Sequence, residues 1–270
     1  MMKSLGLLLA FVALLFLAAA QAQGISSFFP GPGTPAASGG STPVINWSNR
    51  STTAGTWTTA TMNVGSDNKN GSNGTFTSGD LLIAIICISA SVEATDPGSV
   101  SWPAGWTPII NVWDTEPNSV FGDINYRYSV AWKIAGGSET GSYAATWTSN
   151  TRGASWLLFD IGGANGSTPI DASGSHDATA ASVSSMVAPS ISPTGSNDLL
   201  LIAGMYAQGH SPYTTPSGFT LVTGLSATSS GTPDLISYDK ALSSSGATGT
   251  ATITASVSGV YSALSIAITH

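Results

Sequence analysis

The sequence predicts an all-β protein: a jelly-roll-like antiparallel β-sandwich built from two pseudo-repeated halves. Short runs of β-branched and aromatic residues are broken throughout by Gly, Asn and Ser, which is typical of strands joined by turns. No segment places apolar residues at the i, i+3, i+4 and i+7 spacing of an amphipathic helix behind a capping residue. Several blocks of sequence also occur twice, which indicates two units of similar architecture.

The repeat consists of four blocks that return in the same order, at an offset that falls from 118 to 107 residues. A falling offset is expected of duplicated units whose loops differ in length, and a repeat this long corresponds to a whole β-unit rather than a solenoid rung. The paired blocks are Gly79–Ala84 with Asn197–Ile202, Trp102–Thr107 with Thr215–Thr220, Tyr128–Ala135 with Asp234–Ala241, and Ser155–Ile161 with Ser262–Ile268.

Residues 1–22 are predicted to be a signal peptide. Lys3 precedes an apolar run from Leu5 to Ala20, and the small residues that follow give a cleavage site after Ala22. The alternative is a single membrane anchor, but a run of about 16 residues is short for a span of roughly 20. We therefore expect a secreted or extracellular surface protein, with no membrane contact after signal cleavage.

Residues 23–42 are predicted to form an N-terminal arm rich in Gly and Pro. Pro lacks a backbone donor and Gly raises the entropic cost of ordering, so neither a helix nor an interior strand is expected here. Phe28 and Phe29 precede the prolines of this segment. An apolar tip on an extended arm predicts that copies of the chain self-associate through it.

The two halves are predicted at residues 43–165 and 166–270. Residues 162–175 are short for an independent linker, which favours one merged sandwich over two separate domains. Strands of the first half are expected at Val44–Trp47, Thr56–Asn63, Asp80–Ala90, Thr107–Val112, Asn125–Ile134, Gly141–Thr148 and Ala154–Gly162. Strands of the second half are expected at Ala181–Ile191, Asp198–Ala207, Thr220–Leu225, Asp234–Ala241, Gly249–Ser256 and Tyr261–Thr269.

Side-chain alternation distinguishes the faces of these strands. The run Leu81–Ile88 is apolar without alternation, so it is predicted to be a central strand covered on both sides. The run from Tyr126 to Trp132 alternates large apolar side chains with small or charged ones, which predicts two different faces. Cys87, the single cysteine, lies inside the first of these runs and is expected to be a buried hydrophobe without an internal disulfide.

Composition argues against a nucleic-acid partner. Only 8% of residues are charged, against about a quarter in ordinary domains, and the net charge is −7. No basic stripe is present to neutralise phosphates. Gly, Ser, Thr and Ala take the place of charged residues, as in many exported β-proteins with neutral, hydroxyl-rich surfaces.

Four motifs of the first half carry a resemblance to a known kind of module. They are Gly79-Asp-Leu-Leu82, Pro103-Ala-Gly-Trp-Thr107, Ala131-Trp-Lys-Ile-Ala135 and Gly141-Ser-Tyr-Ala-Ala-Thr-Trp147, closed by Trp156-Leu-Leu-Phe-Asp160. This order resembles a β-sandwich module found in phage virion and tail-associated proteins and in exported bacterial surface proteins. The resemblance implies a fold and an exported or virion setting, and it implies no catalytic residue. The predicted signal peptide favours the secreted or surface setting.

Metal and catalytic patterns are largely missing from the sequence. His176, His210 and His270 lack the spacing of zinc ligands, so no metal site is predicted and calcium is the one cofactor left open. No Gly-x-Ser-x-Gly elbow accompanies a histidine. Asp114, Glu116 and the nearby Asp123 are the acids that a glycan-cleaving site would use, but the favoured interpretation is that they are solvated loop acids or a weak calcium site.

Aromatic residues near loops give the candidate ligand-binding set. Trp102 and Trp106 have Thr215 and Phe219 at the matching positions of the second half, and an aromatic present in one half only is freer to serve binding than packing. The alternative is that these rings fill loops or cement the halves. The complete set is Trp102, Trp106, Asn111, Trp113, Asp114, Tyr206, His210 and Tyr213.

Taken together, these features predict a non-catalytic exported surface protein for adhesion, glycan binding or the assembly of an extracellular or virion structure. The alternative is a secreted glycan hydrolase or lyase on a β-sandwich scaffold. An extracellular or cell-surface glycan and further copies of the chain are the expected partners.

Overall fold

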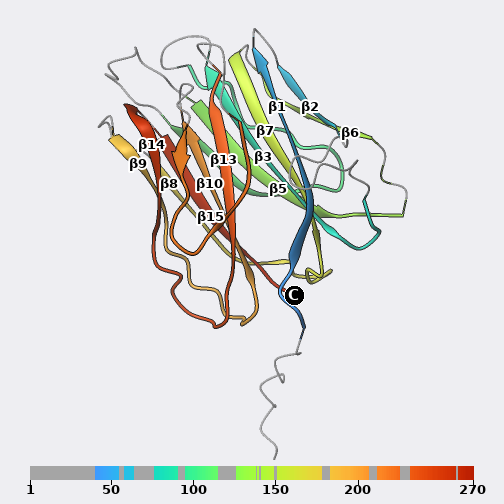
Figure 1. The fold of residues 1–270 in the computed structure, drawn as a ribbon. Coiled ribbons are helices and arrows are strands. Elements are labelled where there is room, and N and C mark those ends of the chain that lie inside the picture. The colour runs from blue at the N-terminus through green and yellow to red at the C-terminus, as the bar shows by residue number, and fades with distance from the viewer. Residues whose placement is uncertain are drawn as a thin grey trace, which may run out of the picture. The chain divides into compact units, whose positions relative to one another are not determined.

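The computed structural model describes residues 40–54, 58–63, 76–90, 95–114, 126–137, 139, 141–148, 151–177, 183–206, 212–225, 232–259 and 261–270. Within these residues the regular elements are all β-strands and every strand pair is antiparallel, which confirms the predicted all-β class (Figure 1). The predicted signal peptide and residues 23–39 of the predicted arm lie outside the described residues. No helix in the described part of the chain is long and apolar enough to cross a membrane.

Fifteen strands follow one another along the described residues, from residue 44 to residue 268. The strands of the first half are β1 (Val44–Ala54), β2 (Thr59–Asn63), β3 (Leu81–Ala90), β4 (Thr107–Asp114), β5 (Tyr126–Ile134), β6 (Ser142–Thr146) and β7 (Thr151–Gly162). The strands of the second half are β8 (Ile170–Asp177), β9 (Val183–Ala188), β10 (Leu199–Tyr206), β11 (Tyr213–Thr214), β12 (Thr220–Leu225), β13 (Asp234–Ala241), β14 (Ala251–Gly259) and β15 (Tyr261–Ile268).

The strands form two five-stranded sheets and two smaller ones. The large sheets have the orders β1-β7-β3-β5-β4 and β12-β13-β10-β15-β8, and the small sheets have the orders β2-β6 and β11-β14-β9. Read from its other edge, the second large sheet has the order β8-β15-β10-β13-β12. If the five strands of each large sheet are ranked by their order in the chain, both sheets have the same arrangement: first, fifth, second, fourth, third. The paired sequence blocks fall on or directly before matching strands, and β3 and β10 are both central. That one ancestral unit was repeated stays a prediction.

The packing of β3 defines the layers. All ten residues of β3 are buried, as expected of an apolar run without alternation. Leu81, Ile83 and Ile85 belong to a core that also contains the second large sheet. Leu82 and Ile86 belong to a second core, shared with β2 and β6. The two large sheets therefore pack face to face. The β2-β6 sheet packs on the side of the first large sheet that is turned away from the second.

A few polar side chains cross between the two large sheets. Ser155 donates a hydrogen bond from Oγ to the carbonyl of Pro233 at 2.5 Å, and Ser262, at the matching position of the second half, donates from Oγ to Asp114 Oδ2 at 2.7 Å. The Tyr126 hydroxyl lies 3.1 Å from the same Ser262 oxygen. Residues 40–270 form one compact unit, held together by these bonds and by the shared apolar core.

Cys87 lies on β3 with no accessible surface, as a free thiol. Burial raises the pKa of this thiol, and the negative charges of Asp114 and Asp234 act in the same direction. A thiol without accessible surface and with a raised pKa is an unreactive side chain of the core.

Candidate functional site

Three of the predicted binding residues lie on one face of the first large sheet. Asn111 and Trp113 lie on β4, opposite Ser129 and Arg127 of β5 in the strand register. Residues two apart on a strand point to the same face, and this face is turned away from the second large sheet because the alternate residues Ile110 and Val112 pack into the shared core.

Trp102 reaches the same face from the loop before β4. Its indole Nε1–H donates a hydrogen bond to Ser129 Oγ at 3.0 Å, and the Ser129 hydroxyl in turn donates to the Ile110 carbonyl at 3.0 Å. The half-buried Trp102 ring is therefore held in a fixed position beside the β4 edge of the sheet. We name the group of Trp102, Asn111, Trp113 and Arg127 the outer face.

Arg127 organises the polar part of the outer face. Its Nη1 donates to Asn111 Oδ1 at 2.6 Å, while Nε and Nη2 donate to the two oxygens of Asp96 at 2.9 and 2.5 Å. The arginine side chain is only 8% exposed, whereas the Asp96 side chain is 40% exposed. A buried guanidinium held by a two-point contact fixes both partners in place, so Asn111 and Asp96 present their polar atoms in a set geometry.

The charge state of Asp96 follows from this contact. Its partial burial alone would raise the pKa of the carboxyl, but hydrogen bonds from Arg127 and from the Gly98 N–H, together with the arginine charge, outweigh burial. The pKa of Asp96 is therefore lowered, and at neutral pH its carboxylate lies beside the outer face, bound to Arg127. Asp96 and Arg127 were not among the predicted binding residues, although an arginine between two tyrosines on an apolar strand is a signal that could have found one of them.

Trp106 lies beneath Trp102 and connects it to the core. The two rings stack at a centroid distance of 5.6 Å and an interplanar angle of 23°. Trp106 is buried and meets the Tyr143 ring edge-on at 5.1 Å. The contact continues from Tyr143 to Phe76 at 6.0 Å and from Phe76 to Trp47 at 5.0 Å. Trp106 thus supports the accessible Trp102 ring and is not itself at the surface.

Asp114, predicted as a hydrogen-bonding partner for a ligand, points to the opposite face from Asn111 and Trp113. It is buried between the large sheets, where its Oδ2 accepts the hydrogen bond from Ser262. The other two acids of the predicted hydrolase set, Glu116 and Asp123, lie outside the described residues. The structure therefore brings Asn111 and Trp113 together with Trp102 and separates Asp114 from them.

The predicted residues of the second half are engaged internally where they are described. Tyr206 is buried and its hydroxyl donates to the Val183 carbonyl at 3.2 Å. Burial, followed by the charge of Asp234, raises the pKa of Tyr206 to about 12. The Tyr213 hydroxyl donates to Asp234 Oδ2. His210 lies outside the described residues.

In each half an aspartate directly before the central strand, Asp80 or Asp198, interacts with a second aspartate, and neither pair was predicted. In the first half Asn46 Nδ2 lies 3.1 Å from Asp80 Oδ2 and 3.4 Å from Asp160 Oδ2. Burial, the charge of Asp80 and a hydrogen bond with Asp80 raise the pKa of Asp160 to about 7. In the second half burial and the charge of Asp171 raise the pKa of Asp198 to about 6.

Neither aspartate pair belongs to a metal-binding group in the part of the chain that the structure describes. No group of three or more His, Cys, Asp and Glu side chains within the described ranges is placed to hold a metal ion.

The fold and the outer face define a class: an antiparallel β-sandwich with an accessible, rigidly supported tryptophan beside a fixed set of polar groups. No protein-family model, curated protein or solved structure matches this chain.

Proposed function

We propose that this chain is a non-catalytic exported surface protein that binds a glycan through the outer face. The observation that carries the proposal is the Trp102 ring, which is stacked on Trp106 and hydrogen-bonded to Ser129, so that it is rigid before any ligand arrives. A sugar ring offers C–H groups on its faces and hydroxyls at its edge. The face of an aromatic ring packs against the sugar C–H groups, and fixed polar groups beside the ring bind the sugar hydroxyls.

The polar groups of the outer face suit sugar hydroxyls in number and kind. Asn111 retains its amide N–H donors because Arg127 occupies its carbonyl oxygen. The partly exposed Asp96 carboxylate is an acceptor, and Trp113 lies next to Arg127 on the same face. Arg127 holds Asn111 and Asp96 in place, so little side-chain entropy is lost when a ligand binds.

Export, adhesion and assembly belong to the same proposal. The predicted signal peptide, the 8% charged content and the hydroxyl-rich sequence support a secreted or cell-surface location. The Phe28-Phe29 arm supports self-association, in which an edge strand such as β1 accepts a neighbouring arm by strand addition. A glycan binder of this kind acts as an adhesin or as a building block of an extracellular or virion structure.

Glycan-array screening of the mature protein, followed by titration of the strongest ligand, tests the proposal. Replacing Trp102 with alanine should lower affinity by about tenfold or more, since truncation of a central tryptophan commonly costs 2 kcal/mol or more. Thr215→Ala, at the matching position of the second half, is the control and should bind as the wild type does. Unchanged affinity of the Trp102→Ala protein for every bound glycan would remove the outer face from the proposal.

The alternative function is a secreted glycan hydrolase or lyase that uses the acids predicted from the sequence, Asp114, Glu116 and Asp123. Alanine at each of these three positions should abolish turnover of a cleaved glycan without unfolding the protein. Unaltered turnover in all three variants would remove these acids from the case.

A further inference from the structure

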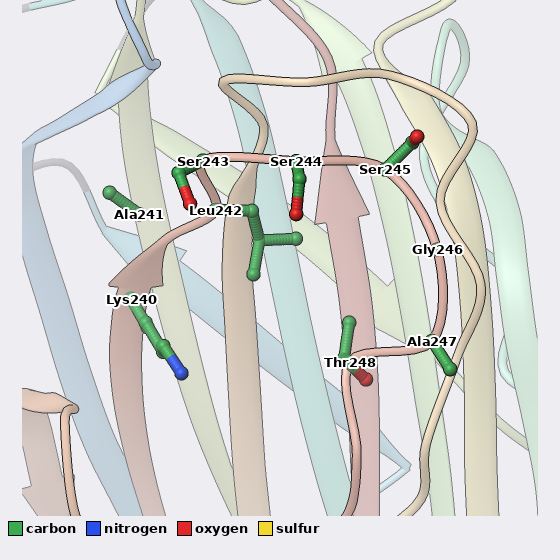
Figure 2. A pocket seen from close by; sticks show the side chains of 9 residues that line it. All are labelled: Lys240, Ala241, Leu242, Ser243, Ser244, Ser245, Gly246, Ala247 and Thr248. Carbon is green, nitrogen blue, oxygen red and sulfur yellow. The ribbon is translucent and has the colours of Figure 1, made fainter.

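A small hollow lies at the loop that joins β13 to β14, on the second half of the chain. It has a volume of about 190 Å³ and is lined by the nine residues from Lys240 to Thr248 (Figure 2). Figure 2 shows the hydroxyls of Ser243 and Ser244 pointing toward the space that the loop encloses, whereas the Ser245 hydroxyl points away from it. The hollow is therefore lined by the hydroxyls of Ser243 and Ser244 and by the Leu242 side chain, with Lys240 at its β13 end.

The loop is held in place by backbone hydrogen bonds at its start, middle and end. Leu242 N–H donates to the Asp198 carbonyl at 2.8 Å, Gly246 N–H to the Pro193 carbonyl at 2.9 Å, and Thr248 N–H to the Ile191 carbonyl at 2.9 Å. Gly246 has a φ of 107°, a conformation that disfavours side chains and requires glycine at this turn. The hollow is thus a fixed part of the surface.

Lys240 supplies the charge of the hollow. Its Nζ lies 5.5 Å from the centroid of the Phe219 ring, so the ammonium group makes a cation–π contact with that ring. No carboxylate in the described part of the chain forms an ion pair with Lys240. The ammonium group therefore lies over Phe219 at the β13 end of the hollow, and it has no ion-pair partner among the described residues.

The first half shows what the corresponding lysine does when an acid is present. Lys133 Nζ lies 2.6 Å from Glu139 Oε1, and the Gly136 N–H donates to the same oxygen at 2.7 Å. The Tyr143 hydroxyl donates to the other oxygen of Glu139. The loop between β5 and β6 therefore carries its own carboxylate, which fills the space beside the lysine.

The two loops correspond through their backbone contacts. Ala135 N–H donates to the Asp80 carbonyl at 2.8 Å, as Leu242 N–H does to the Asp198 carbonyl, so Ser243 takes the place of Gly136. The second loop has Gly246 and Ala247 where the first has Glu139. The lysine and the backbone N–H that hold a carboxylate in the first half are thus present in the second half, while the carboxylate is not.

We propose that this hollow binds the carboxylate of an acidic sugar, such as a uronic acid residue of an extracellular polysaccharide. The ligand carboxylate takes the place that Glu139 occupies in the first half, between the Lys240 ammonium and the Ser243 N–H. The sugar hydroxyls then meet the hydroxyls of Ser243 and Ser244. The hollow lies in the second half and the outer face in the first. The two binding proposals can therefore be tested independently of each other.

The charge of the whole chain limits the affinity of this site. A net charge of −7 repels an anion at long range, so the local contacts must exceed that repulsion. A single ion pair with a few hydrogen bonds at an open surface corresponds to a Kd on the order of 1 mM for one sugar unit. Several acidic units on one polymer, or several copies of the chain, would raise the effective affinity.

Titration of the full mature chain with sodium glucuronate, followed by backbone amide NMR, tests the proposal. The amides of residues 240–248 should shift with glucuronate at constant ionic strength, and glucose and acetate should shift them at least about tenfold less at equal concentration. Lys240→Gln should lower affinity for glucuronate by about tenfold or more, because it removes a charged hydrogen bond. Lys240→Arg should retain part of the affinity. Arg152→Gln, an exposed charge change in the first half, is the control and should bind normally.

A second variant adds the carboxylate that the β13–β14 loop lacks, so that a loss of binding is not caused by removing Lys240. Ala247→Glu places a carboxylate on the loop near the position that Glu139 has in the first half, and it should block glucuronate while the spectrum elsewhere is unchanged. Absence of shifts in residues 240–248, or equal binding by the Lys240→Gln protein, would overturn the proposal. Equal binding of glucose would overturn the role of the carboxylate, and equal binding of acetate would overturn the role of the sugar.

Discussion

Replacing Asp160 with asparagine should stabilise this protein at alkaline pH. The Asp160 side chain is 1% exposed, and its Oδ1 accepts no hydrogen bond within the described ranges. The pKa of the neighbouring Asp80 carboxyl is also raised, and burial is the largest cause. Asn46 donates to both carboxyls from a single nitrogen, and Thr77 donates to Asp80 alone, so Asp160 is the less stabilised of the two negative charges.

The sign of the pH dependence follows from the direction of the shift. The pKa of Asp160 is about 7 in the folded protein against an ordinary value of 3.8, so between these values the folded state holds a proton that the unfolded state has released. The contribution of Asp160 to stability is therefore greatest below about pH 4, falls as the pH rises toward about 7, and stays low above that. Asparagine has the same shape and no charge, so the substitution removes this loss.

The magnitude follows from the same two values. The difference between 3.8 and about 7 corresponds to a ceiling of about 4 kcal/mol. Asp80 is partly exposed, so solvent screens its charge, and the two carboxyls titrate as a coupled pair; we therefore expect about 2 kcal/mol at pH 8. At pH 4 the variant and the wild type should unfold at nearly the same denaturant concentration.

Urea denaturation followed by tryptophan fluorescence between pH 4 and pH 8 measures the difference. The comparison of Asp160→Asn with the wild type isolates this carboxyl from other groups that titrate over the same range. Asp80→Asn should remove most of the same pH dependence, because it removes the neighbouring charge, and the double variant should add little to either single change. A variant no more stable than the wild type at pH 8 would refute the reasoning.

Three further predictions concern the outer face, the core and the arm. Arg127→Gln should lower the free energy of unfolding by about 1–2 kcal/mol at pH 7, because the buried guanidinium loses its hydrogen bonds to Asn111 and Asp96, while the 40% exposure of Asp96 lets water screen the charge that is left; a loss below about 0.5 kcal/mol in chemical denaturation would contradict a structural role for this contact. Gly204→Ala should cost about 1–3 kcal/mol, because its added carbon would lie 2.9 Å from Met186 Sδ and 3.1 Å from Ile253 Cδ1, whereas Gly137→Ala meets nothing within 4 Å and should be nearly neutral; thermal melts of both proteins give the comparison. Electron microscopy of the mature chain beside a truncation that starts at Pro43 tests the arm: ordered fibres or rings from the longer chain alone are expected, and single particles from both would exclude arm-driven assembly.

The candidate outer face could be predicted in part from sequence. Trp102, Asn111 and Trp113 were identified from their position near a loop and from the lack of an aromatic at the matching place for Trp102. Asp114 was predicted to join Asn111 and Trp113 in one site, but the structure places it on the opposite face, as the alternation of side chains along a strand requires. The role of Arg127 could not be predicted, since Asp96 lies 31 residues away along the chain.

Two strands and both aspartate pairs were missing from the sequence prediction for a related reason. The strand β8 consists largely of small and polar residues, so it has little strand signal of its own, and its conformation is set by pairing with the apolar β15. The two-residue β11 is likewise defined by its pairing with β14. Asn46 and Asp160, which meet in the first aspartate site, are 114 residues apart in the chain.

The sequence by itself determined that this protein is all-β, that the apolar run of β3 lies at the centre of a sheet, and that the strand of β5 has two unlike faces. These properties depend on residues a few positions apart, because side-chain alternation and turn chemistry are local. Only the tertiary structure decided which sheet faces meet, which lysine keeps an internal carboxylate and which does not, and which buried acids share a proton. Those outcomes depend on contacts between strands far apart in the chain, and no local pattern of residues encodes such pairing.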